Sequence, residues 1–87
     1  MKKVIIIGAT SGIGKELAKL YSLNKYEVGI AGRRTGLLEA LALELQTKSY
    51  KLTLDVTKTE NAIHSIEKLI QDMHGVDLII ISAGTGH

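Results

Sequence analysis

The sequence predicts an α/β fold: three layers, with a doubly wound parallel sheet between helices on both faces. Continuous aliphatic runs at residues 4–7 and 78–81 are typical of strands that helices cover on both faces. Segments with apolar residues three and four positions apart separate the predicted strands and indicate amphipathic helices. Strict alternation with right-handed crossovers gives strand order 3-2-1-4 in one domain over residues 1–87.

The first strand is the run at about Lys3 to Ile7, and a helix follows from Gly12 or Ile13 to about Leu23. Asn24 is expected to end this helix in the left-handed conformation. The residues expected to form its buried stripe are Ile13, Leu17 and Leu20.

The second strand is expected at Glu27 to Ala31, and a second helix from Thr35 to about Gln46. Thr35 is of a residue type that caps helix N-termini through its hydroxyl, so we expect it to be the N-cap. The predicted apolar stripe of this helix is Leu37, Leu38, Leu41, Ala42 and Leu45.

The third strand, about Tyr50 to Leu54, alternates apolar residues with Lys51 and Thr53 and is therefore expected at the sheet edge. Thr57 and Glu60 have the spacing of a capping box for the third helix. The residues predicted to bury one face of that helix are Ile63, Ile66, Ile70 and Met73. Gly75 is the expected stop, and the fourth strand is expected at Asp77 to Ser82.

Glycines 8, 12 and 14 fall where the first strand turns into the first helix. Such a corner offers free backbone N–H groups and the positive end of a helix dipole, which suit a dinucleotide pyrophosphate. The spacing here is G-x-x-x-G-x-G, whereas the usual dinucleotide fingerprint is G-x-G-x-x-G. An ordinary glycine-rich turn is the alternative.

Charged and small residues follow the other strands. The position where an acidic residue would select NAD holds Gly32 and Arg33, and Arg34 follows. A guanidinium binds a 2′-phosphate through charge-assisted hydrogen bonds, and Gly32 is expected to leave room for it, so NADP is favoured over NAD. The alternative is two solvated arginines. Asp55 is expected either to contact adenine or only to serve a helix cap.

Four features in order resemble the classical short-chain dehydrogenases/reductases across the whole chain. They are Gly8-Ala9-Thr10-Ser11-Gly12-Ile13-Gly14, Gly32-Arg33-Arg34, Leu54-Asp55-Val56-Thr57 and Ser82-Ala83-Gly84. The resemblance implies a Rossmann-type fold, the N-terminal half of a full one, that binds NADP(H). The cofactor-contacting residues that it implies are Gly8, Thr10, Ser11, Gly12, Ile13, Gly14, Arg33, Arg34, Asp55, Val56, Ala83 and Gly84. For Ala83 and Gly84, which would lie near the nicotinamide ribose, a plain turn is the alternative.

The chain also departs from this family. Ile7 stands where the family has Thr, and Ile81 and Ser82 replace two asparagines, so polar groups that tie the loop to the fourth strand are expected to be lost. Family members are longer and carry a catalytic Ser and Tyr-x-x-x-Lys in the half that follows. We expect that half to be absent here, leaving no catalytic residue and an inactive isolated chain. Tyr21 and Lys25 match the Tyr-x-x-x-Lys spacing by chance, at the end of the first helix away from the loop.

Composition narrows the remaining choices. A net charge of +2 with scattered lysines gives no support for nucleic acid, and no apolar run is long enough to span a membrane. The apolar run after Met1, Lys2 and Lys3 is four residues long and ends in glycine, which is too short for a signal peptide, so we expect a cytoplasmic protein. The chain has no cysteine and its three histidines lack metal-ligand spacing, so we expect no metal site. The apolar fourth strand would lie at an open edge, which predicts a homo-oligomer. The alternatives to an oxidoreductase part are a non-catalytic NADP(H)-binding module and a structural protein that has lost the cofactor.

Overall fold

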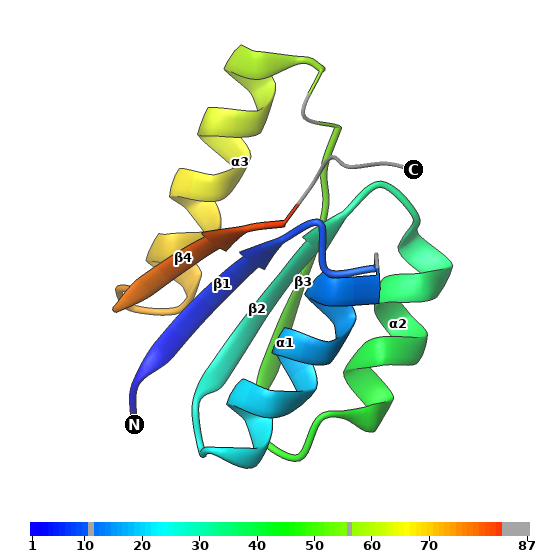
Figure 1. Cartoon of the computed structure of the whole chain (residues 1–87). Coiled ribbons are helices and arrows are strands. Elements are labelled where there is room, and N and C mark those ends of the chain that lie inside the picture. Colours follow the sequence, from blue (N-terminus) through cyan, green and yellow to red (C-terminus); the bar gives the residue numbers. More distant parts are fainter. Residues whose placement is uncertain (11, 56, 83–87) are drawn as a thin grey trace.

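Strands and helices alternate along the whole of the described chain (Figure 1). The computed structural model describes residues 1–10, 12–55 and 57–82. The strands are β1 (Lys3–Ile7), β2 (Glu27–Gly32), β3 (Ser49–Thr53) and β4 (Leu78–Ile81). The helices are α1 (Gly12–Leu23), α2 (Thr35–Glu44) and α3 (Thr59–Asp72). Every predicted element is present, although α2 ends before the expected Gln46.

The four strands form one sheet in the order β3-β2-β1-β4, and every neighbouring pair is parallel. β1 is central, with Val4 opposite Val28 on one side and opposite Leu78 on the other. The predicted strand order is therefore confirmed. β3 lies at one edge, where Lys51 and Thr53 are exposed as their alternation with apolar residues predicts.

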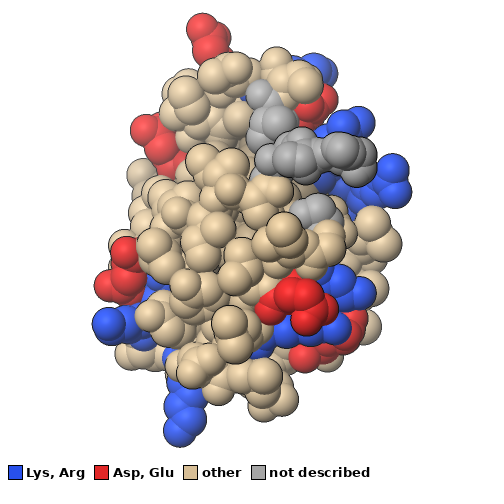
Figure 2. Space-filling model, in the orientation of Figure 1, with Lys and Arg blue, Asp and Glu red and all other residues tan. Residues whose placement is uncertain are grey.

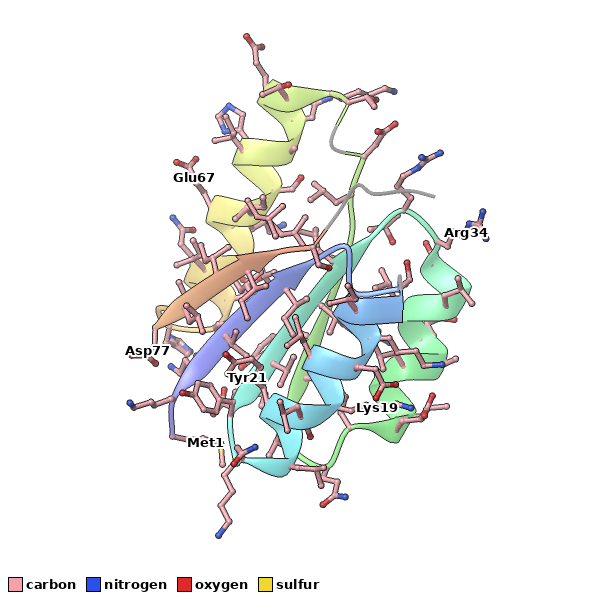
Figure 3. The ribbon with its side chains drawn as sticks, viewed as in Figure 1. Met1, Lys19, Tyr21, Arg34, Glu67 and Asp77 are labelled. Carbon is pink, nitrogen blue, oxygen red and sulfur yellow. The ribbon has the colours of Figure 1, made fainter. Side chains whose placement is uncertain are left out.

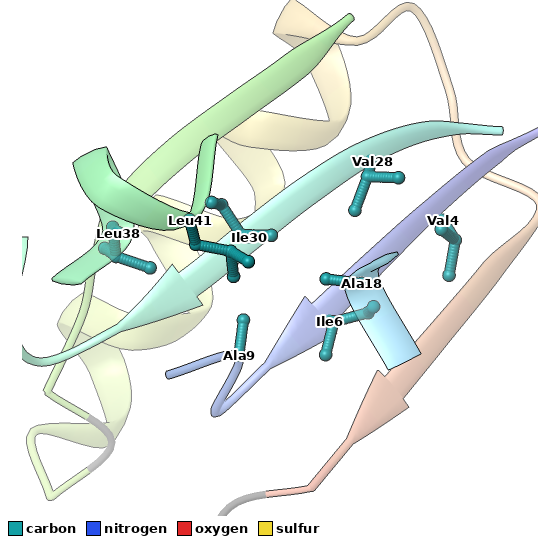
Figure 4. Packing of buried hydrophobic residues seen from close by; sticks show 8 residues of the cluster. All are labelled: Val4, Ile6, Ala9, Ala18, Val28, Ile30, Leu38 and Leu41. Carbon is teal, nitrogen blue, oxygen red and sulfur yellow. The ribbon is translucent and has the colours of Figure 1, made fainter. Parts of the chain in front are cut away.

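Helices cover both faces of the sheet: α1 and α2 pack on one face and α3 on the other (Figure 1). Alternate residues of β1 serve the two layers, since successive side chains of a strand point to opposite faces. The cluster beneath α1 and α2 contains Val4, Ile6, Ala9, Ala18, Val28, Ile30, Leu38 and Leu41 (Figure 4). The cluster beneath α3 contains Ile5, Ile7, Ala31, Leu54, Ala62, Leu69 and Met73. The continuous aliphatic run of β1 is thus explained by burial on both faces.

Helix α1 turns a different face to the sheet from the one that its apolar spacing predicts. Gly14, Ala18 and Ser22 are its buried residues, whereas Ile13 is 73% exposed and Leu20 is 53% exposed. Small side chains let the helix lie close to β1 and β2, so the larger ones are displaced to its flank. The predicted stripe is therefore wrong for Ile13 and Leu20, whereas Leu17 is partly buried and packs against the core.

The stripes predicted for the other two helices are right in part. In α2, Leu38 and Leu41 are buried, but Leu37 is 46% exposed. In α3, Ile63 is 53% exposed, while Ala62 and Leu69 occupy the buried face together with the following Met73. Ile66 and Ile70 pack at the border of the core, as do Ala42 and Leu45 of the second helical segment.

The predicted N-terminal caps of α2 and α3 do not form. The N-caps are Arg34 and Lys58, and neither makes a side-chain capping bond. Thr35 is instead the first residue of α2, and its hydroxyl lies 2.8 Å from the Thr53 hydroxyl. The hydroxyl of Thr57 donates to Asp55 Oδ1 at 2.6 Å, so it is engaged before the helix begins.

The C-terminal ends of α1 and α3 are set by residues with positive φ. After α1 the left-handed residue is Lys25, with φ 66°, and not Asn24. Asn24 instead donates a side-chain hydrogen bond to the carbonyl of Leu20 at 2.8 Å. After α3 and its C-cap Met73, the left-handed residue is His74, with φ 61°. Gly75, the expected stop, follows with φ 108°, a conformation that glycine adopts without steric cost.

Ser22 connects α1 to the loop before β3. It is 2% exposed, and its Oγ accepts hydrogen bonds from the backbone N–H groups of Gln46 at 2.6 Å and Thr47 at 3.1 Å. Replacing Ser22 with Ala removes the acceptor for both groups and is expected to cost about 1 kcal/mol of unfolding free energy. Thermal unfolding followed by circular dichroism tests this, with Ser65→Ala in α3 as the control. An unchanged midpoint in Ser22→Ala would contradict the expected result.

Candidate cofactor site

The residues that the sequence marks as a site follow the strands at one edge of the sheet. Because all four strands are parallel, their carboxyl ends lie together, and open α/β sheets bind ligands outside these ends. The loop from Gly8 to Thr10 follows β1, Arg33 and Arg34 follow β2, and Asp55 comes shortly after β3. The fold therefore gathers these three predicted segments, and Ser82, the described residue of the fourth, follows β4 at the same edge. Four predicted contact residues lie outside the described residues, and these are Ser11, Val56, Ala83 and Gly84.

The loop after β1 is fastened to the end of β2. The backbone N–H groups of Gly8 and Ala9 both donate to the carbonyl of Ala31, at 2.8 and 3.0 Å. Gly8 has φ 85°, so the chain turns at a position that strongly favours glycine. The turn directs the chain from the buried strand into the start of α1, and the first glycine of the motif is explained by its backbone conformation.

The other two glycines of the motif serve different purposes. A Cβ at Gly14 would collide with the carbonyl oxygen of Gly8 and would lie 2.6 Å from Ser82 Oγ. Gly14 therefore permits the close packing of α1 on the loop. A Cβ at Gly12 would meet nothing within 4 Å, and Gly12 is exposed. The first turn of α1 is thus open to solvent at Gly12, where a phosphate can approach the helix N-terminus.

The space beside Gly32 differs from the prediction. A Cβ there would lie 3.3 Å from the Thr10 side chain and 3.5 Å from a methyl group of Leu38, so Thr10 fills the room that was expected for a phosphate. Arg33 and Arg34 are both exposed, and the Arg34 side chain extends outward at the start of α2 (Figure 3). A 2′-phosphate in this region would therefore have to lie on the solvent side of the turn, beside the guanidinium groups.

Asp55 closes a short turn after β3. Its Oδ1 accepts from the Thr57 hydroxyl at 2.6 Å and from the Thr57 backbone N–H at 3.0 Å. These two bonds, the hydroxyl first, lower the pKa of the Asp55 carboxyl below its usual value, and the positive charges of Arg33 and Lys58 add to the effect. Asp55 is consequently anionic at neutral pH and held in one orientation.

Ser82 links β4 to the loop, contrary to the expectation that the link is lost. Its backbone N–H donates to the carbonyl of Ile7 at 2.9 Å. Its hydroxyl lies 3.3 Å from the same carbonyl and 3.2 Å from that of Gly8, with geometry for donation to either. The short serine side chain can do this because β4 ends directly beside the turn.

The contact between the Thr35 and Thr53 hydroxyls is not predicted by the sequence, since two single threonines carry no sequence signal of contact.

The pair Tyr21 and Lys25 lies at the C-terminal end of α1, away from the glycine loop at its start. Tyr21 lies toward the opposite end of the sheet from the loop, near Met1 (Figure 3). Its ring packs edge-on against Tyr26 with centroids 4.8 Å apart, and Lys25 follows the end of α1 in a left-handed conformation. The residues in the described ranges contain no group of three or more side chains able to hold a metal ion. None of the helices they form could cross a membrane.

Comparison with known proteins decides the family. The model of the short chain dehydrogenases matches residues 2–87. The chain belongs to this family. It is 35% identical to a probable NADP-dependent dehydrogenase of Dichelobacter nodosus over 81 residues, which cover 93% of this chain and 76% of that protein. It is also 35% identical to the very-long-chain 3-oxoacyl-CoA reductase of Schizosaccharomyces pombe over 86 residues.

Solved structures of short chain dehydrogenases share the fold. Acetoin dehydrogenase YohF from Salmonella typhimurium superposes with a TM-score of 0.90 at 26% identity over 100% of this chain and 38% of its own. A 3-ketoacyl-(acyl-carrier-protein) reductase from Brucella melitensis, solved with NADH, gives 0.88 at 28% identity over 99% of this chain and 35% of its own. The chain is thus a Rossmann-type member of an oxidoreductase family.

The relatives differ in how much of them this short chain dehydrogenase sequence spans. The match with the S. pombe reductase covers 94% of this chain but only 25% of the reductase. An uncharacterized oxidoreductase of Myxococcus xanthus, 34% identical over 88 residues, is matched over 98% of this chain and 35% of its own length. The matched region is the segment that carries the glycine loop and the four parallel strands.

Proposed function

We propose that this chain binds NADP(H) as the cofactor-binding part of an oxidoreductase that transfers hydride between NADP(H) and a carbonyl or alcohol. The observation that carries the proposal is the loop between β1 and α1, where Gly14 allows tight packing and Gly12 leaves the helix N-terminus open. Backbone N–H groups and the helix dipole at such a corner suit a pyrophosphate. Membership in the short chain dehydrogenase family supports the same ligand.

The remaining contacts are assigned along the edge of the sheet. Pyrophosphate lies over the loop from Gly8 to Gly14, and adenosine extends toward the ends of β2 and β3. Arg33, with Arg34 beside it, binds the 2′-phosphate from the solvent side, because Thr10 fills the space next to Gly32. The Asp55 carboxylate, oriented by Thr57, accepts from the adenine amino group. Val56, Ala83 and Gly84 complete the assigned contacts by family resemblance.

The preference for NADP over NAD rests on the absence of an acidic residue after β2 and on the two exposed arginines that stand there. The D. nodosus relative is described as a probable NADP-dependent dehydrogenase, which agrees with this choice. Calorimetric titration with NADPH tests the proposal, and absence of binding by the folded chain would refute it. Hydride transfer is assigned to a longer form, and a cytoplasmic location stays a prediction.

A second part of the proposal is self-association through β4. Among the described residues β4 pairs only with β1, and it consists of Leu78, Ile79, Ile80 and Ile81. One flank of α1 carries a shallow groove of about 680 Å³ lined by Gly12, Ile13, Glu16, Leu17 and Leu20. Figure 2 shows a broad area with few charged side chains on this side of the molecule, and Glu16 is the charged residue among those that line the groove. Because β4 is apolar and uncharged, the β4 edges of two copies can pair across a two-fold axis without charge repulsion.

The oligomer prediction is tested by a charge on the exposed strand. Ile81 is 71% exposed, so Ile81→Lys disturbs little of the core while placing like charges at the proposed interface. Wild-type protein is expected to sediment as a dimer or larger species and Ile81→Lys as a monomer. Leu43→Lys is the matched control, since Leu43 lies on α2 and is 89% exposed. A monomeric wild type, or equal dissociation by both variants, would contradict the prediction.

A further inference from the structure

The end of β4 and the two ends of the glycine loop meet at one side chain. Ser82 Oγ lies 3.3 Å from the Ile7 carbonyl and 3.2 Å from the Gly8 carbonyl. It also lies where a Cβ on Gly14 would come within 2.6 Å of it. One hydroxyl therefore contacts the residue that ends β1 and the residue that starts the turn, directly beneath the first turn of α1.

We propose that Ser82 is a positioning residue that holds the phosphate-binding loop in its cofactor-competent shape. The proposal rests on the proposed binding of NADP(H), and it adds a residue that contacts the loop and not the cofactor. The Gly8 carbonyl has to point away from the phosphate if the N–H groups at the start of α1 are to face it, because a carbonyl oxygen repels an anion. Donation from Ser82 Oγ holds that carbonyl toward β4.

The backbone bond of Ser82 makes the arrangement specific. Its N–H donates to the Ile7 carbonyl at 2.9 Å and fixes the Cα of Ser82 relative to β1. With Cα fixed, the side chain is short enough to reach both carbonyls, and no longer side chain is needed. On the other side of the loop, the N–H groups of Gly8 and Ala9 donate to the Ala31 carbonyl. The turn is thus held from β2 through its N–H groups and from β4 through its carbonyls.

Burial and packing favour a precise role over a general one. Ser82 is only partly exposed, and Gly14, which packs against its hydroxyl, is buried. Any shift of Ser82 toward α1 is limited by the helix, and any shift of the loop toward α1 brings the Gly8 carbonyl against Gly14. The hydroxyl of Ser82 therefore holds the loop at a fixed position between the end of β4 and the start of α1.

Three variants separate the hydrogen bond from the volume of the side chain. Ser82→Ala removes the hydroxyl with little change in volume, Ser82→Cys replaces it with a larger thiol that is only a weak donor, and Ser82→Thr keeps the hydroxyl. Ile81→Val, at the neighbouring exposed position, is the matched control. If the hydrogen bond matters, Cys behaves like Ala, and Thr retains the wild-type behaviour.

The first measurement is amide hydrogen exchange of the protein without cofactor. Exchange at Gly8, Ala9 and Gly14 is expected to accelerate about three- to tenfold in Ser82→Ala and Ser82→Cys, the loss of one net hydrogen bond, while β2 amides are unchanged. Unchanged exchange in both variants would overturn the proposal whether or not the protein binds a cofactor. Acceleration spread equally over β2 would also overturn it, since the role would then be general stability.

The second measurement compares two ligands by calorimetry. NADPH uses the loop through its pyrophosphate, whereas adenosine 2′-monophosphate has no group for the loop. NADPH affinity is expected to fall about three- to tenfold in Ser82→Ala and Ser82→Cys, with adenosine 2′-monophosphate affinity unchanged. Equal losses for both ligands, or no loss for NADPH, would overturn the positioning role. A wild type that binds neither ligand would refute the proposed function, while the exchange result would still decide whether Ser82 holds the loop.

Discussion

Removal of the Arg33 side chain is expected to weaken NADPH binding about tenfold to hundredfold and to leave NADH binding almost unchanged. Arg33 is exposed at the end of β2, and within the described residues no ion pair occupies it or Arg34. Both guanidinium groups are therefore available to a 2′-phosphate, which accepts two charge-assisted hydrogen bonds from such a group. The nicotinamide ends of the two cofactors are the same, so only the 2′-phosphate separates them.

The measurement is calorimetric titration of NADPH and NADH into wild type, Arg33→Ala, Arg34→Ala and the double variant. Lys68→Ala is the control, because Lys68 is an exposed cation on α3 and tests general charge loss. Titration at low ionic strength keeps the electrostatic contribution large. A wild type that binds both cofactors equally would show that the arginines are only solvated surface. Equal loss of both cofactors in Arg33→Ala would assign the side chain a structural role.

The strand order, and the edge of the sheet at which the candidate site lies, could be predicted because the apolar pattern of a strand reflects how it is buried. β1 is buried on both faces and is a continuous aliphatic run, whereas β3 has one polar face and alternates. Parallel pairing then places the residue after each strand at the same edge. Arg33, Asp55 and the glycine loop were located by this reasoning, while their contacts with a cofactor stay predictions.

The buried face of α1 could not be predicted from apolar spacing. Ile13, Leu17 and Leu20 recur as a helical stripe should, yet the sheet is approached by Gly14, Ala18 and Ser22. Close approach of helix and sheet favours small residues, so the larger apolar residues lie on the flank of the helix. The stripe in the sequence therefore marks the groove, and only Leu17 of it also packs against the core.

Local polar contacts were missed for a different reason. A threonine just before a helix is typical of an N-cap, but its hydroxyl can bond instead to another polar group that the fold brings close. Thr57 donates to Asp55 two residues earlier, and Thr35 pairs with Thr53 on another element. The sequence predicts that the contact is lost at Ser82, and only the structure shows that β4 ends within reach of the loop carbonyls.

Substitution of Gly14 by Ala is expected to lower the unfolding free energy by about 1 to 3 kcal/mol and to abolish detectable NADPH binding. The added methyl group meets the Gly8 carbonyl and lies 2.6 Å from Ser82 Oγ, so α1 or the loop has to move. Backbone on one side and a hydrogen-bonded hydroxyl on the other leave little freedom to relax. For a domain of this length the midpoint of thermal unfolding falls by roughly 5 to 20 °C.

Gly12→Ala and Gly36→Ala add the same methyl group at uncrowded glycines and are the controls for the effect on stability. Neither added Cβ would meet an atom within 4 Å, and both glycines lie in helices, so both variants should gain a fraction of a kcal/mol, about 0.5, in stability. They differ in place: the Cβ of Gly12→Ala lies at the proposed phosphate position, and that of Gly36→Ala on the open surface of α2. NADPH affinity should therefore fall in Gly12→Ala and hold in Gly36→Ala. Thermal unfolding with calorimetric titration of all three variants measures both effects, and a Gly14→Ala protein as stable as Gly36→Ala would show that the loop accommodates the methyl group.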